Sequence, residues 1–248
     1  MFRTEDGIVV PAVTAAQMRE VDRLATEEFG LGILQMMENA GRNLASNVME
    51  MLGGPSTGLR TKARGEVTVL AGSGGNGGGG LCCARHLHNR GFTVWVVLSK
   101  QAATLTGAAA NQLHILQAAG VGACLKHAPA QAEEVILRAQ VVVDALIGYS
   151  LRGAPRGRVA ELIDLCNQHA VRVLSLDVPS GLDATTGEAA GVVMRAERTL
   201  TLALPKTGLR DVPGELYLAD IGIPPELYQR LGLSVDPPFG KRYWVHLL

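Results

Sequence analysis

Apolar positions in the first part of the chain recur with the spacing of a helix. Positions 18, 21, 24 and 25 would share one helix face, and a capping box at Thr14 and Gln17 precedes them. This pattern predicts a helix that runs to about Phe29. A second periodic stretch begins at Leu34 and predicts another helix, which closes near Gly53-Gly54-Pro55.

From residue 66 onward, short apolar runs alternate with helical segments. The runs predict strands at Val67–Ala71, Thr93–Leu98, Ala123–Lys126, Val141–Ala145, Arg172–Leu176, Arg198–Leu202 and Glu215–Ala219. The intervening segments predict helices at Leu81–Asn89, Gly107–Ala119, Ala130–Ala139 and Arg158–His169. Each step from strand through helix to strand implies a right-handed parallel crossover. The predicted fold is therefore α/β: a Rossmann-like, doubly wound, mostly parallel sheet with an extra N-terminal helical pair.

No linker-like stretch divides the chain. We therefore expect one domain over residues 1–248, with a core at about 14–231 and a C-terminal tail at 232–248. The tail is expected to leave the core near Pro237-Pro238.

Composition narrows the class of protein. Hydrophobic residues make up 47% of the chain and aromatic residues only 4%, so Val, Leu, Ile and Ala must fill the core, as in a parallel sheet under helices. Lys plus Arg and Asp plus Glu number 23 each, so no net field attracts nucleic acid or an anionic membrane. No stretch approaches the roughly 20 apolar residues of a membrane span, and residues 1–16 contain no run of signal-peptide type.

The cysteines favour a reduced compartment. Cys82, Cys83, Cys124 and Cys166 include no C-x-x-C pair, and the first two are neighbours in a predicted helix. A cytoplasmic protein with buried thiols fits this spacing better than a disulfide framework does.

A glycine-rich turn follows the first strand and opens a helix. Seven of the ten residues in Ala71–Gly80 are glycine, the residue that loses most backbone entropy on folding. A tight turn between strand and helix needs only one or two. Bare backbone N–H groups at a helix start can hold phosphate oxygens, so the turn predicts binding of phosphate or a nucleotide.

Gly72, Gly74 and Gly77 satisfy the dinucleotide pattern G-x-G-x-x-G. An ordinary NAD dehydrogenase also needs an acidic residue at the end of the second strand. That strand ends in Ser99-Lys100, so the acid is missing, although the lysine leaves an NADP-type site open. The turn also lacks the G-K-[ST] ending of a P-loop.

Polar side chains lie at three predicted strand ends. Asn76 follows the first strand, Asp144 ends Val141–Asp144, and Asp177 ends Val173–Asp177. Ligands of open parallel sheets bind beyond the carboxyl ends of strands. A carboxylate at the end of an apolar strand needs a partner or a task, and a helix cap or loop-fixing hydrogen bond is the alternative to a site.

Ser180 offers a hydroxyl in the turn that follows Asp177. Together with Asn76 and Asp144 it supplies hard oxygen donors of modest charge, which favour a monovalent cation over a tightly bound divalent one. The sequence has no G-x-S-x-G and Ser180 has no evident base, so hydrolase chemistry is not expected. The histidines lack metal-ligand spacing and are interpreted as structural; those considered are His86, His88, His114, His127 and His169.

Over roughly Thr14 to Leu231, the chain resembles the NAD(P)H-hydrate epimerases, the YjeF N-terminal domain family. The matching stretches, in the family's order, are Gln35–Gly41, the glycine turn with Gly80-Leu81 and Ala84–Leu87, Asp144–Gly148, Asp177–Glu188, Leu204–Gly208 and Asp220–Pro224.

The resemblance implies an enzyme that interconverts the R and S epimers at C6 of hydrated NADH or NADPH for nucleotide repair. A separate dehydratase then acts on the product. The chain is similar to stand-alone members without the dehydratase domain, and these are often homodimers.

The resemblance also implies roles for single residues. Asn76, Asp144 and Ser180 correspond to ligands of a potassium ion. Asp177 corresponds to a substrate contact and is our candidate for proton transfer near C6. Two segments correspond to substrate binding: Gly75, Asn76, Gly77, Gly78 and Gly79, and the loop Gly148, Tyr149, Ser150, Leu151, Arg152, Gly153 and Ala154.

The glycine turn departs from the family pattern G-x-G-N-N-G-G-D-G, because Gly75 stands for the first Asn and Gly79 for the Asp. Backbone amides survive both changes, but two polar side chains do not. An active epimerase therefore competes with a catalytically degenerate member that binds a nucleotide or a protein partner without turnover. An NADP-dependent oxidoreductase is a third interpretation.

Overall fold

The computed structural model describes residues 1–53, 65–121, 125–126 and 129–248. Several predicted features fall outside these ranges: Gly54-Pro55 of the second helix stop, Ala123 and Cys124 of the third strand, and His127.

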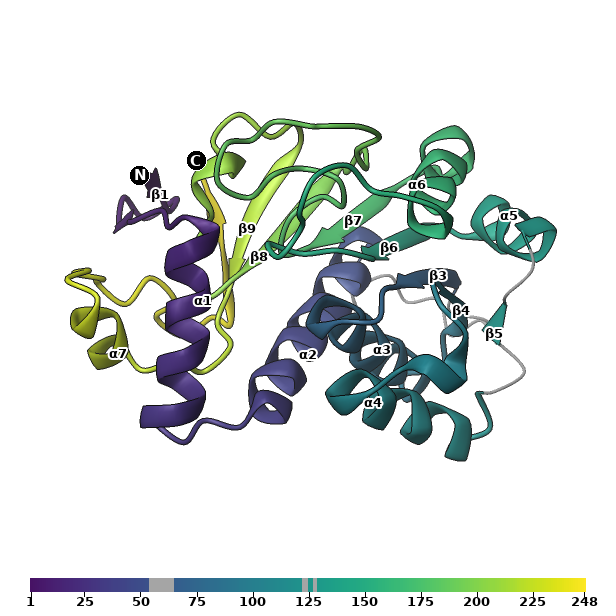
Figure 1. Cartoon of the computed structure of the whole chain (residues 1–248), viewed down its shortest axis with the longest axis horizontal. Coiled ribbons are helices and arrows are strands. Elements are labelled where there is room, and N and C mark those ends of the chain that lie inside the picture. Colours follow the sequence, from purple (N-terminus) through teal and green to yellow (C-terminus); the bar gives the residue numbers. More distant parts are fainter. Residues whose placement is uncertain (54–64, 122–124, 127–128) are drawn as a thin grey trace.

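One large sheet organises the chain (Figure 1). Its strands are β3 (Glu66–Ala71), β4 (Thr93–Leu98), β5 (Leu125–Lys126), β6 (Val141–Ala145), β7 (Val173–Leu176), β8 (Arg198–Leu202), β9 (Glu215–Ala219) and β10 (Trp244–Leu247). Their order is β10-β9-β8-β7-β6-β3-β4-β5, and every pairing is parallel except that of β10 with β9. The chain runs from β3 to one edge and returns at β6 toward the other. The order of the strands therefore reverses between β3 and β6, where ligands of such sheets bind.

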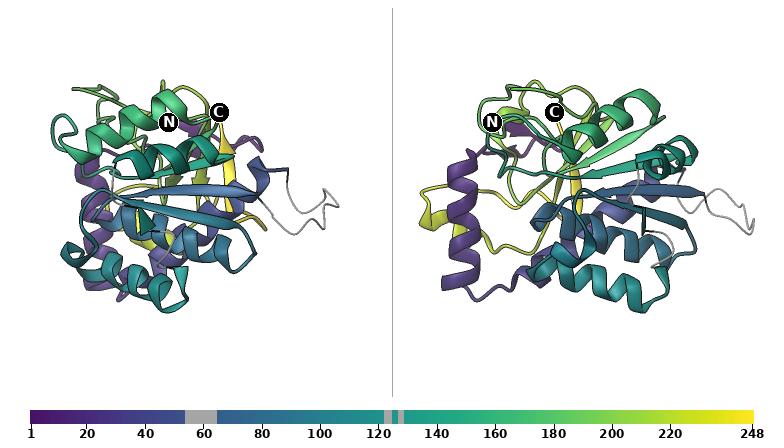
Figure 2. Two further views of the ribbon diagram at one scale, coloured as in Figure 1. Left: turned by 90° about the vertical axis from the view of Figure 1, so that its right-hand side faces the viewer. Right: turned by 45° about the vertical axis from the view of Figure 1, so that its right-hand side comes forward.

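Helices cover both faces of the sheet, as Figure 2 shows. They are α2 (Ile33–Met51), α3 (Gly75–His88) and α4 (Gly107–Ala118) on one face, and α5 (Pro129–Arg138) and α6 (Arg158–His169) on the other. Neighbouring strand residues point to opposite faces. Val69 packs in the cluster that holds α2, α3 and α4, whereas Leu70 packs with α5 and α6. The predicted doubly wound, mostly parallel sheet is confirmed.

The two N-terminal helices belong to different parts of the fold. Helix α1 (Ala15–Arg23) starts at the predicted Thr14–Gln17 capping box and continues as a π-helical turn over Leu24–Glu28, so the predicted end near Phe29 is confirmed. It packs in an apolar cluster with the short helix α7 (Pro225–Arg230) and strands β9 and β10, whereas α2 packs against α3. None of the described helices combines the length and apolar character needed to cross a membrane.

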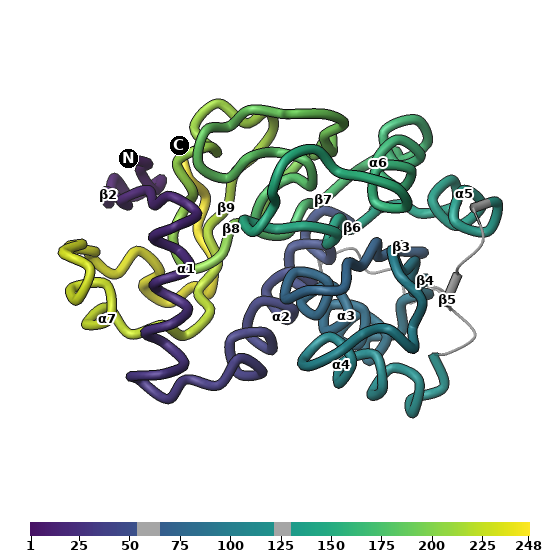
Figure 3. The backbone as a smooth tube through the Cα atoms, viewed as in Figure 1, coloured from purple at the N-terminus to yellow at the C-terminus, as the bar shows by residue number. Residues whose placement is uncertain are grey.

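The expected tail at residues 232–248 is wrong for its last part. Strand β10 pairs antiparallel with β9, and its alternate residues Val245 and Leu247 are buried. Four residues after a Pro-rich stretch are too short to stand out as a strand, but their alternation buries one apolar face. The chain ends also meet, since Leu248 N–H donates to the Arg3 carbonyl (2.7 Å), and Figure 3 shows both termini on the same side. The N-terminal strands are β1 (Phe2–Arg3) and β2 (Val9–Val10).

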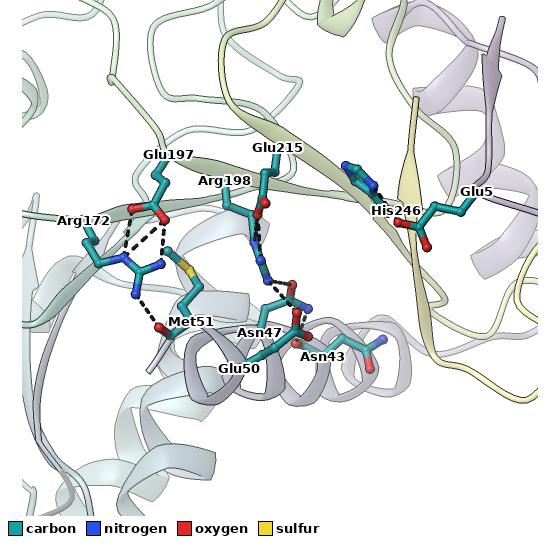
Figure 4. Close-up of polar contacts among 10 residues, drawn as sticks. All are labelled: Glu5, Asn43, Asn47, Glu50, Met51, Arg172, Glu197, Arg198, Glu215 and His246. Carbon is teal, nitrogen blue, oxygen red and sulfur yellow. Dashed lines mark hydrogen bonds and ion pairs between the residues drawn. The ribbon is translucent and has the colours of Figure 1, made fainter. Parts of the chain in front are cut away.

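A polar network fastens α2 to the amino ends of the strands (Figure 4). Arg198, the first residue of β8, donates to Glu215 (2.8 Å) and contacts Asn47 and Glu50 of α2 at 3.3 and 3.4 Å. Arg172 pairs with Glu197 and donates to the carbonyl of Met51, the last residue of α2. These contacts hold the end of the helix and leave the opposite rim of the sheet free for a site.

Candidate functional site

Asp144 lies at the bottom of the carboxyl rim, inside the sheet. Its side chain is fully buried, and its oxygens accept bonds from the hydroxyls of Ser180 (2.6 Å) and Ser175 (2.8 Å) and from the amides of Ser180 (2.9 Å) and Leu146 (3.3 Å). Burial raises the pKa of the Asp144 carboxyl, and the bonds from Ser180 and Ser175 oppose that shift. These four hydrogen-bond donors offset the free-energy cost of burying the carboxyl.

Ser180 joins Asp144 to the loop after β6. Besides its bond to Asp144, the buried hydroxyl accepts the Ile147 amide (2.9 Å). A hydroxyl oxygen has two lone pairs, so one stays available to another ligand. The predicted grouping of these two residues from separate strand ends is present in the structure.

Asn76 lies in the first turn of α3, above the same rim. Its amide nitrogen is buried and has no partner among the described residues. Gly148 separates this side chain from Asp177: a Cβ built at Gly148 would lie 3.1 Å from Asn76 Oδ1 and 2.7 Å from Asp177 Oδ2. A carboxamide that buries an unused polar atom is costly unless something else binds there.

Asp177 is held in an unusual backbone conformation. Its φ is +69°, and the Val178 amide donates to the Leu176 carbonyl (2.9 Å), which makes a γ-turn centred on Asp177. Left-handed residues other than glycine are uncommon, and they cluster where a side chain must be aimed. The turn directs the Asp177 carboxylate back over the rim, where Oδ2 accepts the Tyr149 amide (2.9 Å).

Lys206 binds the other oxygen of Asp177. Its side chain is completely buried, and its ammonium donates to Asp177 Oδ1, to the Leu202 carbonyl (2.9 Å) and to the Thr201 hydroxyl (3.3 Å). This lysine is not among the site residues predicted from the sequence. A charge at the end of an apolar strand was the signal used for Asp144 and Asp177. Lys206 lies four residues beyond the end of β8, so this signal does not reach it.

Tyr149 spans the space between the ion pair and α1. Its hydroxyl donates to Asp22, and its ring lies 5.9 Å from the Lys206 ammonium. Burial raises the pKa of the Asp22 carboxyl. Burial and the bond to Asp22 also raise the pKa of the Tyr149 phenol. Asp22 is therefore a second site residue that the sequence analysis missed, since nothing in its helical pattern distinguishes it from a surface aspartate.

The glycine run is mainly a helix packed against its neighbours. Helix α3 begins at Gly75 and not near Leu81 as predicted. A Cβ at Gly77 would lie 1.9 Å from the Gly72 carbonyl oxygen, one at Gly78 would lie 2.4 Å from Met37, and one at Gly80 would lie 2.5 Å from Ala145. Close packing therefore explains several glycines that the sequence analysis assigned to phosphate binding.

The accessible part of the run is its beginning. Gly74 and Gly75 are exposed, and a Cβ at either would meet nothing within 4 Å. Gly79 is buried and faces the Leu176 side chain, 2.8 Å from a built Cβ. In the second predicted segment, Ser150, Arg152 and Gly153 are exposed, whereas Gly148 is buried.

The prediction that no histidine has metal-ligand spacing is wrong for His86. Cys82 and His86 lie one turn apart on α3, and their ligand atoms and those of Glu38 are all within 4.8 Å of one another. However, the Arg85 guanidinium donates to Glu38 and to the Cys82 sulfur (3.3 Å), and burial raises the pKa of the Cys82 thiol to about 12. A neutral thiol beside a guanidinium is a poor cation site, so we interpret this group as an ion-pair network between α2 and α3.

Comparison with known proteins adds independent information. The family model described as YjeF-related protein N-terminus matches residues 33–208. An NAD(P)H-hydrate epimerase of Dehalogenimonas lykanthroporepellens is 48% identical over 248 residues, which cover 99% of this chain and 96% of that protein. An NAD(P)H-hydrate epimerase of Truepera radiovictrix is 37% identical, with 95% of this chain and 100% of that protein covered.

Two further matches concern domain arrangement and fold. A bifunctional NAD(P)H-hydrate repair enzyme Nnr of Moorella thermoacetica is 37% identical over 87% of this chain but only 41% of its own length. The crystal structure of the yeast protein YNL200c superposes with a TM-score of 0.82 at 23% identity, and covers 96% of this chain and 100% of the yeast chain. This last likeness concerns the fold alone.

Proposed function

The chain belongs to the YjeF-related protein N-terminus family, and from this premise we propose that it interconverts the R and S epimers at C6 of hydrated NADH and NADPH. Two relatives that carry the name NAD(P)H-hydrate epimerase match nearly the whole chain. The observation that carries the proposal is the Asp177 carboxylate, aimed over the carboxyl rim by a left-handed backbone and a buried lysine.

The geometry suits Asp177 for proton transfer. Oδ1 is committed to Lys206, while Oδ2 faces Gly148 and the Tyr149 amide. C6 of the hydrate bears a hydroxyl and a ring nitrogen, so inversion requires one of these bonds to open and re-form. In this proposal Oδ2 takes the hydroxyl proton as the C6–N bond opens, so that C6 becomes an aldehyde carbon and the electron pair of the broken bond stays on the ring nitrogen. The nitrogen then adds to the other face of the aldehyde, and Oδ2 returns the proton to the C6 oxygen. The reaction is then balanced, with no net proton change.

Lys206 is fully enclosed and has three acceptors for its three N–H bonds, so its role in this proposal is to position Asp177. Truncating it would leave a buried carboxylate without its counter-charge.

We also propose that Asn76, Asp144 and Ser180 hold a potassium ion. The donor set fits: Ser180 keeps one lone pair, and the Asn76 amide has an unused buried atom, which becomes the carbonyl oxygen if the amide is turned over. One carboxylate with neutral oxygens suits a monovalent cation. When bound, the ion would supply positive charge beside the anionic substrate.

The start of α3 and the loop 148–154 are proposed to bind the dinucleotide. The exposed Gly74 and Gly75 leave the N-terminal amides of α3 open to the pyrophosphate, and the exposed Arg152 can meet a phosphate. The substrate segments proposed from the sequence, Gly75–Gly79 and Gly148–Ala154, contribute here through these exposed positions.

A second candidate function is nucleotide or partner binding without turnover. It is favoured by Gly75 and Gly79, which carry no polar side chain toward the substrate. The enclosed ion pair of Asp177 and Lys206 favours turnover, because an unused buried pair gives no gain in stability over apolar residues.

The proposed setting is the cytoplasm, with a separate dehydratase that consumes one epimer and with the protein acting as a homodimer. The bifunctional relative from Moorella thermoacetica supports a functional pairing, since this chain matches less than half of that enzyme.

The test supplies the slow epimer of hydrated NADH with excess dehydratase and ATP, and follows absorbance. The parent protein should exceed the spontaneous rate, and Asp177→Asn should lose at least about 100-fold in kcat. Asp164→Asn, an exposed aspartate on α6, is the matched control and should behave as the parent does. A parent rate no higher than the spontaneous one refutes the epimerase. A rate that is indifferent to potassium, compared with an inert cation, refutes the cation site.

A further inference from the structure

Helix α4 is exposed but carries no charged side chain. Residues 101–125 contain no Asp, Glu, Lys or Arg, although these types make up 19% of the chain. Every other described α-helix has at least one of them. Positions 111, 114, 115, 117 and 118 of α4 are nevertheless exposed. Solvated helix faces are normally rich in charge, whereas the centres of protein interfaces are depleted of it, so α4 has the composition of a contact surface.

The exposed side of α4 forms a stripe suited to another helix. Its residues recur at intervals of three and four and therefore lie along one side of the helix: Ala108, Asn111, Ile115 and Ala118. Ala108 is half-buried and the other three are exposed. The small residues at both ends allow a second helix to approach closely, and Ile115, which is 36% exposed, adds an apolar side chain near the centre.

The beginning of α2 continues this surface. Figure 1 shows both helices at the lower edge of the molecule. A hollow of about 450 Å³ lies between them and is lined by Leu34, Gln35, Glu38, Asn39, Asn111 and Gln112. Three large apolar side chains are exposed just before α2 and in its first turn: Phe29 (37%), Ile33 (54%) and Leu34 (42%). Exposed apolar side chains that gather in one place mark a contact site, whereas single ones do not.

Gln112 contributes an unused hydrogen-bond acceptor to the hollow. Its side chain is only 3% exposed, and its Oε1 atom is buried with no partner among the described residues. A buried amide oxygen without a partner lowers stability, so the folding of a single chain does not account for it. A molecule that covers the hollow can supply the missing donor.

The lack of charge favours a second copy of this chain over a different partner. In a two-fold contact the same surface faces itself, so side chains near the axis meet those of the same region in the other copy. Charged side chains there would meet like charges, whereas a different partner can supply the opposite sign. Helix α4 avoids this repulsion over all of its 12 residues. Glu38, the charged residue of the hollow's lining, is already paired with Arg85 and His86.

We propose that α4 and the beginning of α2 form the contact of a homodimer. In this arrangement α4 packs antiparallel against α4 of a second copy, about a two-fold axis that passes between Asn111 and Ile115. The exposed Ile33 and Leu34 are covered at the edge of the contact. The inference takes the homodimer from the proposed function and gives its location, but it does not depend on the epimerase reaction.

The experiment measures the mass of the whole chain by sedimentation over a range of protein concentrations. The parent should be a dimer, and Ile115→Glu should weaken the dimer at least about 100-fold, because it places two like charges beside the axis. Leu137→Glu, which changes an exposed leucine of α5 on the other face of the sheet, is the matched control and should remain a dimer. Circular dichroism and urea unfolding should show that both variants are folded.

Mixing two variants tests the two-fold arrangement. Ile115→Lys alone should also be monomeric. An equal mixture of Ile115→Glu and Ile115→Lys should form a heterodimer, because opposite charges then face each other across the axis. Ile33→Ser should weaken the parent dimer about 10-fold, since its apolar surface is no longer buried.

The proposal is overturned if the parent stays a monomer at every concentration, or if the mixture does. It is equally overturned if Ile115→Glu and Ile33→Ser dimerise as the parent does, because the contact then lies elsewhere. Dimerisation through this face in a protein without epimerase activity would refute the proposed reaction and keep the contact. Epimerase activity in a monomeric parent would do the reverse.

Discussion

Two buried cations lie at opposite ends of β8, and their surroundings differ. Arg198 starts the strand and contacts the carboxylates of Glu215 and Glu50, and its guanidinium lies 4.3 Å from the Tyr217 ring. Both carboxylates are about half exposed, at 49% and 48%. Water therefore shares the charge of this network, which fastens α2 to the sheet.

Lys206 follows the end of the same strand and contacts a single carboxylate, that of Asp177. Both members of this pair are nearly enclosed, with side chains 1% and 5% exposed. The backbone is unusual at this end only: the two left-handed residues other than glycine in the described chain, Asp177 (φ +69°) and Ala203 (φ +62°), directly follow β7 and β8. The amino rim of the sheet therefore attaches a helix, whereas the carboxyl rim holds a charged side chain in one orientation.

Lys206→Met is expected to have the largest effect and tests whether the two rims differ in this way. Because it leaves the Asp177 carboxylate buried without a counter-charge, we expect a loss of about 3–5 kcal/mol in the free energy of unfolding. Epimerase kcat should fall at least about 100-fold, because Asp177 is no longer held. Denaturant unfolding and the coupled assay measure the two effects.

A double variant separates the two losses. Lys206→Met with Asp177→Asn should regain most of the stability and none of the activity. If Lys206→Met keeps parental kcat in its folded fraction, the pair does not position the reaction.

Arg198→Met should cost less and affect only folding. We expect about 1–3 kcal/mol, because the freed carboxylates can turn to water, with KM and kcat unchanged in the folded protein. Urea unfolding beside the coupled assay checks this. A selective loss of kcat would contradict the division between the two rims.

Tyr149→Phe tests the hydrogen bond between Tyr149 and Asp22, which lies beside the Asp177–Lys206 pair. Removing the hydroxyl frees the loop from Asp22 while the Tyr149 amide stays bonded to Asp177. We expect KM to rise several-fold, with about 1 kcal/mol of stability lost. Tyr243→Phe, an exposed tyrosine, is the control. If the two variants have equal KM and kcat, the Tyr149 hydroxyl has no role in the site.

Ala203→Gly compares the two left-handed turns directly. Glycine adopts a positive φ without the steric cost that alanine has, so the variant should gain up to about 1 kcal/mol at unchanged activity. Thermal unfolding measures this. A loss of stability would mean that the Ala203 methyl contact outweighs the backbone strain.

The smallest expected effect is the pH dependence that Asp22 introduces. Burial raises its pKa above the ordinary value of 3.8, so the folded state retains a proton that the unfolded state has released. Relative to Asp22→Asn, the parent should be most stable below pH 3.8 and lose stability as the pH rises through the raised pKa. Unfolding curves for both proteins across this range test the sign.

The sequence predicts the architecture because each element carries its own signal. Apolar strands such as Val141–Ala145 are buried on both faces, so they read as continuous apolar runs, and the Thr14 capping box marks a helix start locally. The start of α3 is not predictable in this way, because a run of glycines has the propensity of a turn. Its helix is imposed by close packing against Met37, Gly72 and Ala145.

The site is predictable only where a strand end carries an uncommon residue. Asn76, Asp144 and Ser180 stand out by position, and the structure brings Asp144 and Ser180 into direct contact. Asp22 does not stand out, since its role depends on Tyr149, 127 residues further along the chain. Gln112 also reads as an ordinary helical residue until its burial is known.

The edge strand β10 has a consequence for how the protein is made. Residues 244–247 complete a sheet whose other described strands are all synthesised before them. Until they emerge, β9 presents an unpaired edge, a template for pairing with another nascent chain. A chaperone that covers this edge during synthesis would therefore prevent such pairing, and a protease that removes residues 244–247 would expose the edge again.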